Sequence, residues 1–273
     1  MTNNKYFLEG AKVKLIARDF AFTEGPATDK DGNVYFTDQP NDAIWRYGID
    51  GKLTQFMKPS GRSNGMYFDR EGNLISCADE KNELWSIDPQ KNITVLLKEY
   101  EGRRFNGPND VWVHPNGGMY FTDPRYKREY WKLTTPQLED ENVYYLPKGA
   151  GAAIQVIDAI KKPNGIVGTE DGKTLYVADI GDNKTYKYSI NSDGTLSNAQ
   201  LFCELGSDGM TLDKYGNLYL TGKGVTVYDP TGKRIEHFDI PEDWTANVTF
   251  CGTNRDQLFV TASKGVYLVV GNQ

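Results

Sequence analysis

Six carboxylate or carboxamide side chains stand at one fixed distance before a phrase that recurs along this chain of 273 residues. The phrases are GNVYFTD (32–38), GNLISCA (72–78), GGMYFTD (117–123), GKTLYVAD (172–179), GNLYLTG (216–222) and RDQLFVTA (255–262). Eight residues before the start of each phrase lie Glu24, Asn64, Asn109, Asn164, Asp208 and Asn247. We call these six residues the polar column. Each carries a side-chain oxygen that can accept a hydrogen bond or bind a cation.

The chemistry that such a set favours is the binding of a hard divalent cation. Two carboxylates, Glu24 and Asp208, together with up to four neutral amide oxygens suit Ca²⁺, and suit Mg²⁺ or Mn²⁺ less well. Zn²⁺ is disfavoured because no His or Cys belongs to the column. The alternative is a plug of hydrogen-bonded amides and water without any ion.

The spacing of the phrases predicts the elements that must position the column. Successive phrases begin 40, 45, 55, 44 and 39 residues apart, a period typical of propeller blades with four strands each. Each phrase is followed by a second run rich in aromatic and β-branched residues, and Gly, Asn, Asp and Pro separate the runs. Helical periodicity is almost absent, and 134–141 is the one segment that could form a helical turn or two. We therefore expect an all-β, six-bladed β-propeller with four antiparallel strands per blade.

We name the strands of each blade A to D in chain order, with the column residue at the start of strand A and the recurring phrase as strand B. The last blade has three strands before the chain stops at Gln273, and a spare strand, KVKLIARD (12–19), precedes the first column residue. We expect this N-terminal strand to close the last blade as its outer strand, which removes an open sheet edge. The prediction is one domain over residues 1–273.

The A strands of a propeller line the central channel, so the column should converge at one mouth of it. The D-to-A and B-to-C loops share that face, and the A-to-B turns lie at the far end. His114 belongs to a far turn and His237 to an outer strand, which disfavours a Ser-His-Asp hydrolase or a metal held by histidine. Asp123 ends a B strand and could support the column from behind, although capping a B-to-C turn is the favoured reading.

The third B-to-C loop is much longer than the others and should cover the mouth. We call residues 124–141 the lid. Long loops over an active face often form a wall of the substrate site. Tyr126, Tyr130 and Trp131 could offer stacking surfaces, and Arg104 approaches the mouth from a D-to-A loop. We expect the lid to select the substrate and not to bind the metal; packing on a neighbouring blade or subunit is the alternative.

Bulk composition narrows the classes of partner. Net charge is −6 and the pI about 5.1, which argues against a nucleic-acid surface. No apolar run approaches the roughly 20 residues of a membrane helix, so no membrane partner is expected. The N-terminus has no signal-peptide pattern, which favours the cytoplasm, while a periplasmic or secreted location stays open if a signal was removed. The three cysteines are predicted to be buried core thiols, and monomer or homo-oligomer is undetermined.

Five short motifs carry a family resemblance across essentially the whole chain. In order they are EGP (24–26), RRFNGPNDV (103–111), FTDP (121–124), PNGI (163–166) and SDGM (207–210). They resemble the SMP-30/gluconolactonase/luciferin-regenerating-enzyme family of six-bladed propellers, most of whose characterised members hydrolyse lactones with one divalent metal in the channel. The resemblance implies that Glu24, Asn164 and Asp208 hold the metal, and that Asn109 is a fourth ligand or a substrate contact. Arg104 matches an arginine-containing substrate loop.

These observations support a metal-dependent hydrolase that opens a sugar lactone. The metal, most readily Ca²⁺ with Mg²⁺, Mn²⁺ or Zn²⁺ left open, would polarise the carbonyl, and Asp208 would activate water. Asn109, Arg104, Tyr126 and Trp131 would contact the substrate. Behind the ligands we place Asp123, Asn64 and Asn247. The alternatives are phosphotriester hydrolysis at the same site, or a binding platform without catalysis whose channel metal is structural.

Overall fold

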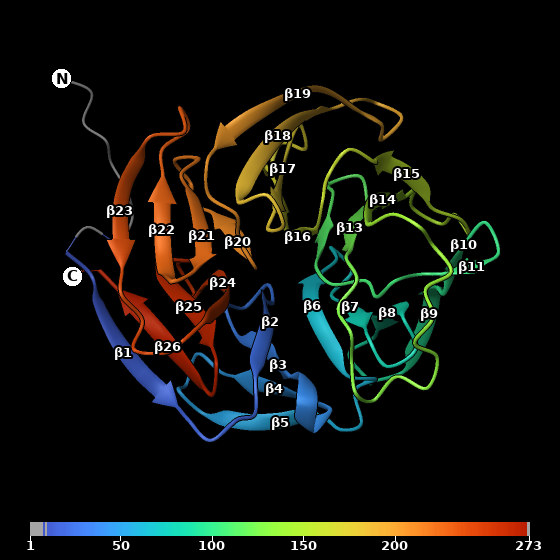
Figure 1. The fold of residues 1–273 in the computed structure, drawn as a ribbon. Coiled ribbons are helices and arrows are strands. Elements are labelled where there is room, and N and C mark those ends of the chain that lie inside the picture. Colours follow the sequence, from blue (N-terminus) through green and yellow to red (C-terminus); the bar gives the residue numbers. More distant parts are fainter. Residues whose placement is uncertain (1–7, 9, 272–273) are drawn as a thin grey trace.

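The computed structural model describes Leu8 and residues 10–271, and the regular secondary structure of this part of the chain is almost entirely β-strand. Within it, six antiparallel sheets of four strands each form the blades of a propeller around a central axis (Figure 1). A two-stranded hairpin, β10 (Glu99–Tyr100) with β11 (Arg103–Arg104), and a 3-10 helix, η1 (Gln39–Asn41), complete the described elements. The predicted fold class is confirmed; residues 134–141 contain no helix.

The four strands of every blade follow each other outward from the channel. The A strands are β2 (Thr23–Thr28), β6 (Ser63–Phe68), β12 (Val111–Val113), β16 (Pro163–Gly168), β20 (Met210–Leu212) and β24 (Thr245–Cys251). The B strands are β3 (Val34–Asp38), β7 (Leu74–Ala78), β13 (Met119–Asp123), β17 (Thr174–Asp179), β21 (Leu218–Gly222) and β25 (Gln257–Ala262). The C strands are β4 (Ala43–Tyr47), β8 (Glu83–Ile87), β14 (Asn142–Leu146), β18 (Lys184–Ile190), β22 (Gly224–Tyr228) and β26 (Gly265–Val270). The D strands are β5 (Leu53–Met57), β9 (Ile93–Leu97), β15 (Ile154–Ile157), β19 (Leu196–Cys203), β23 (Arg234–Phe238) and β1 (Lys12–Ala17).

The N-terminal strand closes the sixth blade, as the sequence predicts. β1 pairs antiparallel with β26, with Lys12 opposite Val270 and Leu15 opposite Tyr267, and the sheet order is β1-β26-β25-β24. Figure 1 shows β1, in blue, lying beside β26, in red. The two ends of the chain therefore share one sheet, and this pairing completes the ring.

The recurring phrase sets the turn that joins strands A and B. In blade 1, Asp29 accepts hydrogen bonds from the backbone N–H of Asn33 at 2.9 Å and from its side-chain Nδ2 at 2.8 Å, while Gly32 adopts φ 96°. The same Asp–Asn pairing recurs in blades 2 and 5, between Asp69 and Asn73 and between Asp213 and Asn217. Asp and Asn side chains that bond the backbone, with Gly at positive φ, explain why the sequence repeats here.

The threonine near the end of the phrase links neighbouring blades. In blades 1, 3 and 5 its hydroxyl donates to a backbone carbonyl on the A strand of the next blade, at or beside the column residue. The bonds run from Thr37 to Asn64 at 3.3 Å, from Thr122 to Asn164 at 2.8 Å and from Thr221 to Ala246 at 2.9 Å. The recurring phrase therefore helps to position the column residue of the following blade as well as that of its own blade.

Close approach of the A strands explains the glycine that follows most column residues. An added Cβ at Gly25 would collide with the backbone carbonyl of Asn64, and one at Gly209 would collide with the side chain of Asn247. Neighbouring blades therefore meet at the channel at a distance that leaves no room for a side chain.

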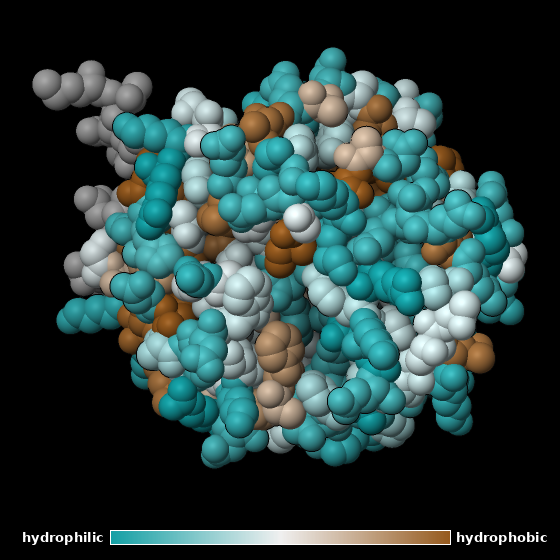
Figure 2. All heavy atoms as spheres, viewed as in Figure 1, coloured by the Kyte–Doolittle hydropathy of each residue, from teal (hydrophilic) through white to brown (hydrophobic). Residues whose placement is uncertain are grey.

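Two further expectations concern the core and the membrane. Cys77, Cys203 and Cys251 are free thiols and buried, as predicted. Among the residues that the structure describes, there is no helix with the length and apolarity of a membrane span. The surface seen in Figure 2 is mostly hydrophilic or neutral, with hydrophobic residues scattered over it.

Candidate metal centre

Irregular pairing of the A strands aims the column side chains. The register with strand B shifts near Glu24 in β2, near Asn164 in β16 and just before Asn247 in β24. Such β-bulges commonly re-aim a side chain next to a functional site. Asn109 and Asp208 each lie two residues before a strand, β12 and β20 respectively, in the loops that enter these strands.

Glu24 and Asn164 both lie close enough to Asp208 to influence the pKa of its carboxyl group. Burial raises the pKa of Asp208, and its contacts with the side chains of Trp244, Asn164 and Glu24 lower it in part. Asn247 joins the group because its Nδ2 donates to Glu24 Oε2 at 3.2 Å. Four blades, the first, fourth, fifth and sixth, therefore contribute to one cluster.

Burial differs within the column in a way that bears on chemistry. Glu24, Asn64, Asn109, Asn164 and Asn247 are each at most 5% exposed. Asp208 is partly exposed. Of the two column carboxylates, Asp208 is therefore the more accessible one.

Two amide oxygens at the centre lack a protein partner. Among the described residues, Asn64 Oδ1 and Asn164 Oδ1 are buried atoms without a hydrogen-bond donor. An unsatisfied buried acceptor costs about 1–3 kcal/mol, so such atoms call for an explanation. A cation held by Asn164 and the two carboxylates would satisfy Asn164 Oδ1.

The pKa values of the two column carboxylates also indicate that a cation could bind here. Burial raises the pKa of Glu24 well above its usual value, and the neighbouring charges of Asp208 and Asp110 raise it further. Burial also raises the pKa of Asp208, to about 6. Crowded buried acids of this kind are costly to ionise unless a cation offsets their charge.

Amide oxygens are essential to this donor set. In the described part of the chain no three His, Cys, Asp or Glu side chains gather as a metal site by themselves. The set of Glu24, Asp208 and amide oxygens therefore fits a hard divalent ion that accepts neutral oxygen ligands.

Sequence reasoning missed Asp110, a buried acid in the same channel. Its Oδ1 accepts the backbone N–H of Val111 at 3.0 Å, and its Oδ2 accepts Nδ2 of Asn247 at 3.4 Å. Burial raises the pKa of Asp110 to about 8. Since Asn247 also donates to Glu24, Asp110 is linked to the column from behind. The available signal was that Asp110 takes the place of the glycine that follows Glu24, Asn64, Asn164 and Asp208.

Trp244 is a second residue whose contact at the centre the sequence left unassigned. Its indole Nε1 donates to Asp208 Oδ2 at 2.7 Å. Its backbone N–H donates to Ser263 Oγ at 3.1 Å, which anchors the D-to-A loop of the sixth blade. Trp244 therefore holds one oxygen of the Asp208 carboxylate in place.

One aromatic side chain of the lid reaches the column. The hydroxyl of Tyr126 accepts a hydrogen bond from Asn164 Nδ2 at 2.8 Å. Lys162 Nζ lies 4.6 Å and the Arg128 guanidinium carbon 5.2 Å from the centre of the Tyr126 ring. The bond leaves the Asn164 amide oxygen directed away from Tyr126 and its nitrogen satisfied.

The other predicted substrate contacts hold the lid to the body of the protein. Trp131 Nε1 donates to the backbone carbonyl of Asp79 at 2.6 Å. Arg104 donates from Nη2 to the carbonyl of Thr135 at 2.9 Å and from its backbone N–H to Gln137 Oε1 at 2.6 Å. These bonds place Trp131 and Arg104 at the base of the lid, and their contact with a substrate stays a prediction.

Asp123 supports the loop that leads into the column. Its carboxylate accepts the backbone N–H groups of Asn106 and Gly107, at 2.9 and 2.8 Å, and burial raises its pKa to about 7. Asp38 and Asp179 make the equivalent bonds to the D-to-A loops of blades 1 and 4. Asp38 and Asp179 also cap their B-to-C turns, since they accept hydrogen bonds from Asn41 Nδ2 at 2.7 Å and from the backbone N–H of Asp182 at 3.2 Å, as favoured from the sequence.

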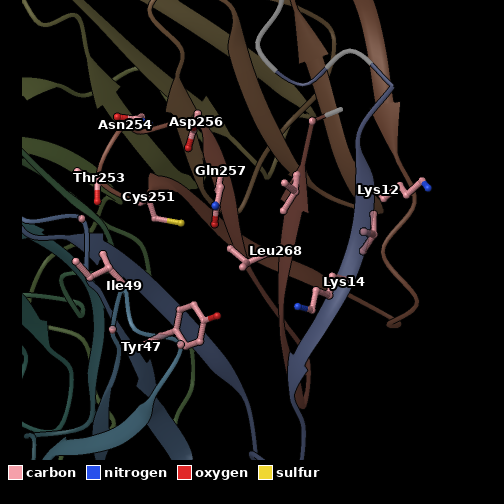
Figure 3. A pocket seen from close by; sticks show the side chains of 17 residues that line it. Lys12, Lys14, Tyr47, Ile49, Cys251, Thr253, Asn254, Asp256, Gln257 and Leu268 are labelled. Carbon is pink, nitrogen blue, oxygen red and sulfur yellow. The ribbon is translucent and has the colours of Figure 1, made fainter. Parts of the chain in front are cut away.

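Two large cavities lie away from the mouth. One, of about 890 Å³, opens at the A-to-B turns and reaches inward to Asp110 and Asn247, with His114 in its wall. The other is a groove of about 900 Å³ between blades 1 and 6, where Lys12, Tyr47 and Cys251 line the wall (Figure 3). His237 lies on the outer strand β23, so the structure places both histidines where the sequence expects them.

Comparison with known proteins assigns the chain to a family. The model of the SMP-30/gluconolactonase/LRE-like region matches residues 22–264. A gluconolactonase of Zymomonas mobilis is 28% identical over 292 residues, covering 94% of this chain and 80% of that protein. The diisopropyl-fluorophosphatase of Loligo vulgaris is 28% identical over 244 residues, covering 80% and 78%. A solved structure of a gluconolactonase from Xanthomonas campestris superposes with a TM-score of 0.89 at 25% identity, covering 96% of this chain and 90% of the other.

Proposed function

The chain belongs to the SMP-30/gluconolactonase/LRE-like family, and from this premise we propose that it is a metal-dependent hydrolase that opens a sugar lactone. The observation that carries the proposal is the cluster of column residues in the channel, in which Glu24 is buried, Asp208 is partly exposed and two buried amide oxygens lack a partner. The similarity to gluconolactonases over most of the chain supports the substrate class.

In this proposal Glu24, Asn164 and Asp208 hold one divalent cation, with Asn109 as a fourth ligand or as a substrate contact. Ca²⁺ suits these oxygens best, and Mg²⁺, Mn²⁺ and Zn²⁺ remain candidates. When bound, the cation would polarise the lactone carbonyl and stabilise the negative charge that develops on its oxygen. Asn64 and Asn247 stand behind the ligands, and Asn247 orients Glu24 through its hydrogen bond at 3.2 Å.

Asp208 is the proposed general base. It would take a proton from a water molecule as the water oxygen forms a bond to the lactone carbonyl carbon. The bond between that carbon and the ring oxygen then breaks, the ring oxygen takes up a proton, and the product is a hydroxy acid. Without a metal, burial raises the pKa of Asp208 to about 6, and a bound cation would lower it, so Asp208 would be ionised at pH 7 and able to accept a proton.

Trp244 and Tyr126 have supporting roles on either side of Asp208. Trp244 donates to Asp208 Oδ2 at 2.7 Å, which orients the carboxylate. Burial keeps the pKa of Tyr126 above its usual value, so its hydroxyl stays protonated. Because this hydroxyl accepts from Asn164, its own hydrogen can be donated to a substrate oxygen. We propose that Arg104 and Trp131 also contact the substrate, from the base of the lid.

A second candidate is phosphotriester hydrolysis at the same site. The relevant observation is the identity of 28% with a diisopropyl-fluorophosphatase. A binding platform with a structural channel metal is the non-enzymatic alternative. Both hydrolytic reactions need an electrophilic centre beside a metal and a base. Only a test with the two kinds of substrate can therefore distinguish them.

A pH-indicator assay tests these three functions together. The purified protein is given glucono-lactone, other aldonolactones or diisopropyl fluorophosphate, with and without EDTA, and elemental analysis identifies the resident metal. Lactone hydrolysis above the uncatalysed rate, lost in EDTA and restored by a divalent ion, supports the proposal. Hydrolysis of the organophosphate alone supports the second candidate, and activity towards none of them, with metal present, supports the platform.

A further inference from the structure

The lid belongs to blade 3, but its contacts lie on the blades to either side. At one end of the sequence 126–131, Tyr126 contacts Asn164 of blade 4. At the other end, Tyr130 and Trp131 contact Asp79, which follows strand β7 of blade 2. The lid therefore bridges the mouth of the channel between two attachment points.

Asp79 is the centre of the attachment on blade 2. Its Oδ2 accepts hydrogen bonds from Arg128 Nε at 2.9 Å, from the Tyr130 hydroxyl at 2.5 Å and from Gln39 Nε2 at 3.2 Å. Its backbone carbonyl accepts the indole N–H of Trp131 at 2.6 Å. The Asp79 side chain is 4% exposed and that of Arg128 is 23% exposed. Three lid residues thus converge on one buried acid that the column does not include.

The shape of the surroundings also favours this attachment. An added Cβ at Gly107 would lie 2.7 Å from Asp79 Oδ1 and 3.2 Å from the Trp131 ring, and Gly107 adopts φ 149°. The Arg62 guanidinium carbon lies 4.5 Å from the centre of the Tyr130 ring, and the Arg62 backbone carbonyl accepts the backbone N–H of Asp79 at 3.4 Å. The absence of a side chain at Gly107 therefore leaves the space that Asp79 and Trp131 occupy.

We propose that Asp79 is a positioning residue for the metal centre, acting through the lid. Its bonds to Arg128 and Tyr130 hold the lid so that the Tyr126 hydroxyl meets Asn164 Nδ2. That contact directs the unsatisfied Asn164 Oδ1 towards the centre. The lid therefore orients a candidate metal ligand as well as covering the mouth, which goes against a strict separation of substrate selection from metal binding.

General experience with metal sites gives the size of the effect. Loss of an outer partner that orients a ligand typically weakens metal binding or activity about 10- to 100-fold. Asp79→Asn removes the negative charge opposite Arg128 while keeping the size of the side chain. Tyr126→Phe removes the bond to Asn164 while keeping the ring. If the two residues act in series, the double variant should be little worse than the more affected single variant.

The experiment compares Asp79→Asn, Tyr126→Phe, the double variant and Arg128→Met, with Asp182→Asn as a matched control. Asp182 also forms ion pairs, with Lys161 at 2.5 Å and Lys184 at 2.7 Å, but outside the lid. Two readouts need no substrate: hydrogen exchange of peptides covering 126–132 in the metal-free protein, and calorimetric titration with Ca²⁺, Mn²⁺ or Zn²⁺. A third, KM and kcat for gluconolactone, rests on the proposed function.

We expect exchange over 126–132 to be at least about tenfold faster in Asp79→Asn and Arg128→Met, and unchanged in Asp182→Asn. Metal binding should weaken about tenfold in Asp79→Asn and in Tyr126→Phe, without adding in the double variant. KM should rise more than kcat falls in Asp79→Asn. If Asp79→Asn does not fold, Arg128→Met tests the same attachment from its partly exposed side.

Unchanged exchange in both lid variants would overturn the attachment. Full additivity of the two metal-binding losses would overturn its link to Asn164, and so would failure of all three ions to bind the unaltered protein. Absence of lactone hydrolysis with the exchange and binding results as expected would instead count against the proposed function alone.

Discussion

Asp208→Asn should lower activity and raise the stability of the metal-free protein at the same time. The replacement has nearly the same shape, and the new amide oxygen can still accept the indole N–H of Trp244 that Asp208 Oδ2 accepts at 2.7 Å. The change removes one of the two column carboxylates and, with it, the proposed base. Fold and loop position should therefore be kept while the chemistry is lost.

The two magnitudes come from the site itself. General base catalysis contributes about 10²–10⁴ in rate, or about 2.7–5.5 kcal/mol of barrier, so kcat should fall by at least 10². Burial raises the pKa of Asp208 from 3.8 to about 6, and each unit corresponds to about 1.4 kcal/mol. Above pH 6 the folded, metal-free protein carries this cost of roughly 3 kcal/mol, and the Asn variant does not.

Two assays with one control test whether Asp208 is the base and whether its buried charge destabilises the metal-free protein. Turnover is measured at saturating Ca²⁺, and urea unfolding is followed in EDTA at pH 8, with Asp182→Asn expected to match the unaltered protein in both. Near-normal turnover of Asp208→Asn in excess Ca²⁺ would show that Asp208 is a ligand only and that the base lies elsewhere. Loss of stability in EDTA would refute the buried-charge reasoning.

Three other outcomes follow from the same geometry. Asn109→Ala removes a neutral oxygen that water can replace, at about 0.5–1.5 kcal/mol, so kcat/KM should fall by no more than about tenfold, and a loss as large as that of Asp208→Asn would contradict this ranking. Gly209→Ala places a Cβ against Asn247 and should destabilise by about 1–3 kcal/mol in urea unfolding, whereas Gly151→Ala, with no atom within 4 Å of the added Cβ, should be neutral. The metal-free protein should lose stability as pH rises from about 4 to about 8, because burial raises the pKa values of Asp208 and Asp110 to about 6 and about 8. Over this range the folded state keeps protons that the unfolded chain has already lost. Thermal unfolding in EDTA measures the dependence on pH, and a rise in stability over the range would contradict the prediction.

Local and periodic features were predictable from the sequence because they repeat. The phrase GNVYFTD and its five relatives carry a turn, a strand and a fixed distance to the column, and this is enough to predict six blades and the closing strand 12–19. The convergence of Glu24, Asn164 and Asp208 follows as well, since equivalent positions of blades that share one axis must meet at the same end of the channel.

Contacts between residues that do not occupy equivalent positions in the repeat could not be predicted from the sequence. The lid has no counterpart in the other blades, so its attachment to Asp79 and its contact with Asn164 could not be inferred from spacing. The same holds for Trp244, whose bond to Asp208 depends on how the last D-to-A loop crosses the mouth.

The amino-acid sequence by itself determined the fold and the positions of the column residues in the blades, because periodicity places them without knowledge of any contact. Only the tertiary structure decided which of these atoms are buried without partners, and how far burial raises the pKa values of Glu24, Asp208 and Asp110. Those properties depend on the distances between blades, and such distances are set by packing across the whole ring, which a pattern in one strand does not contain.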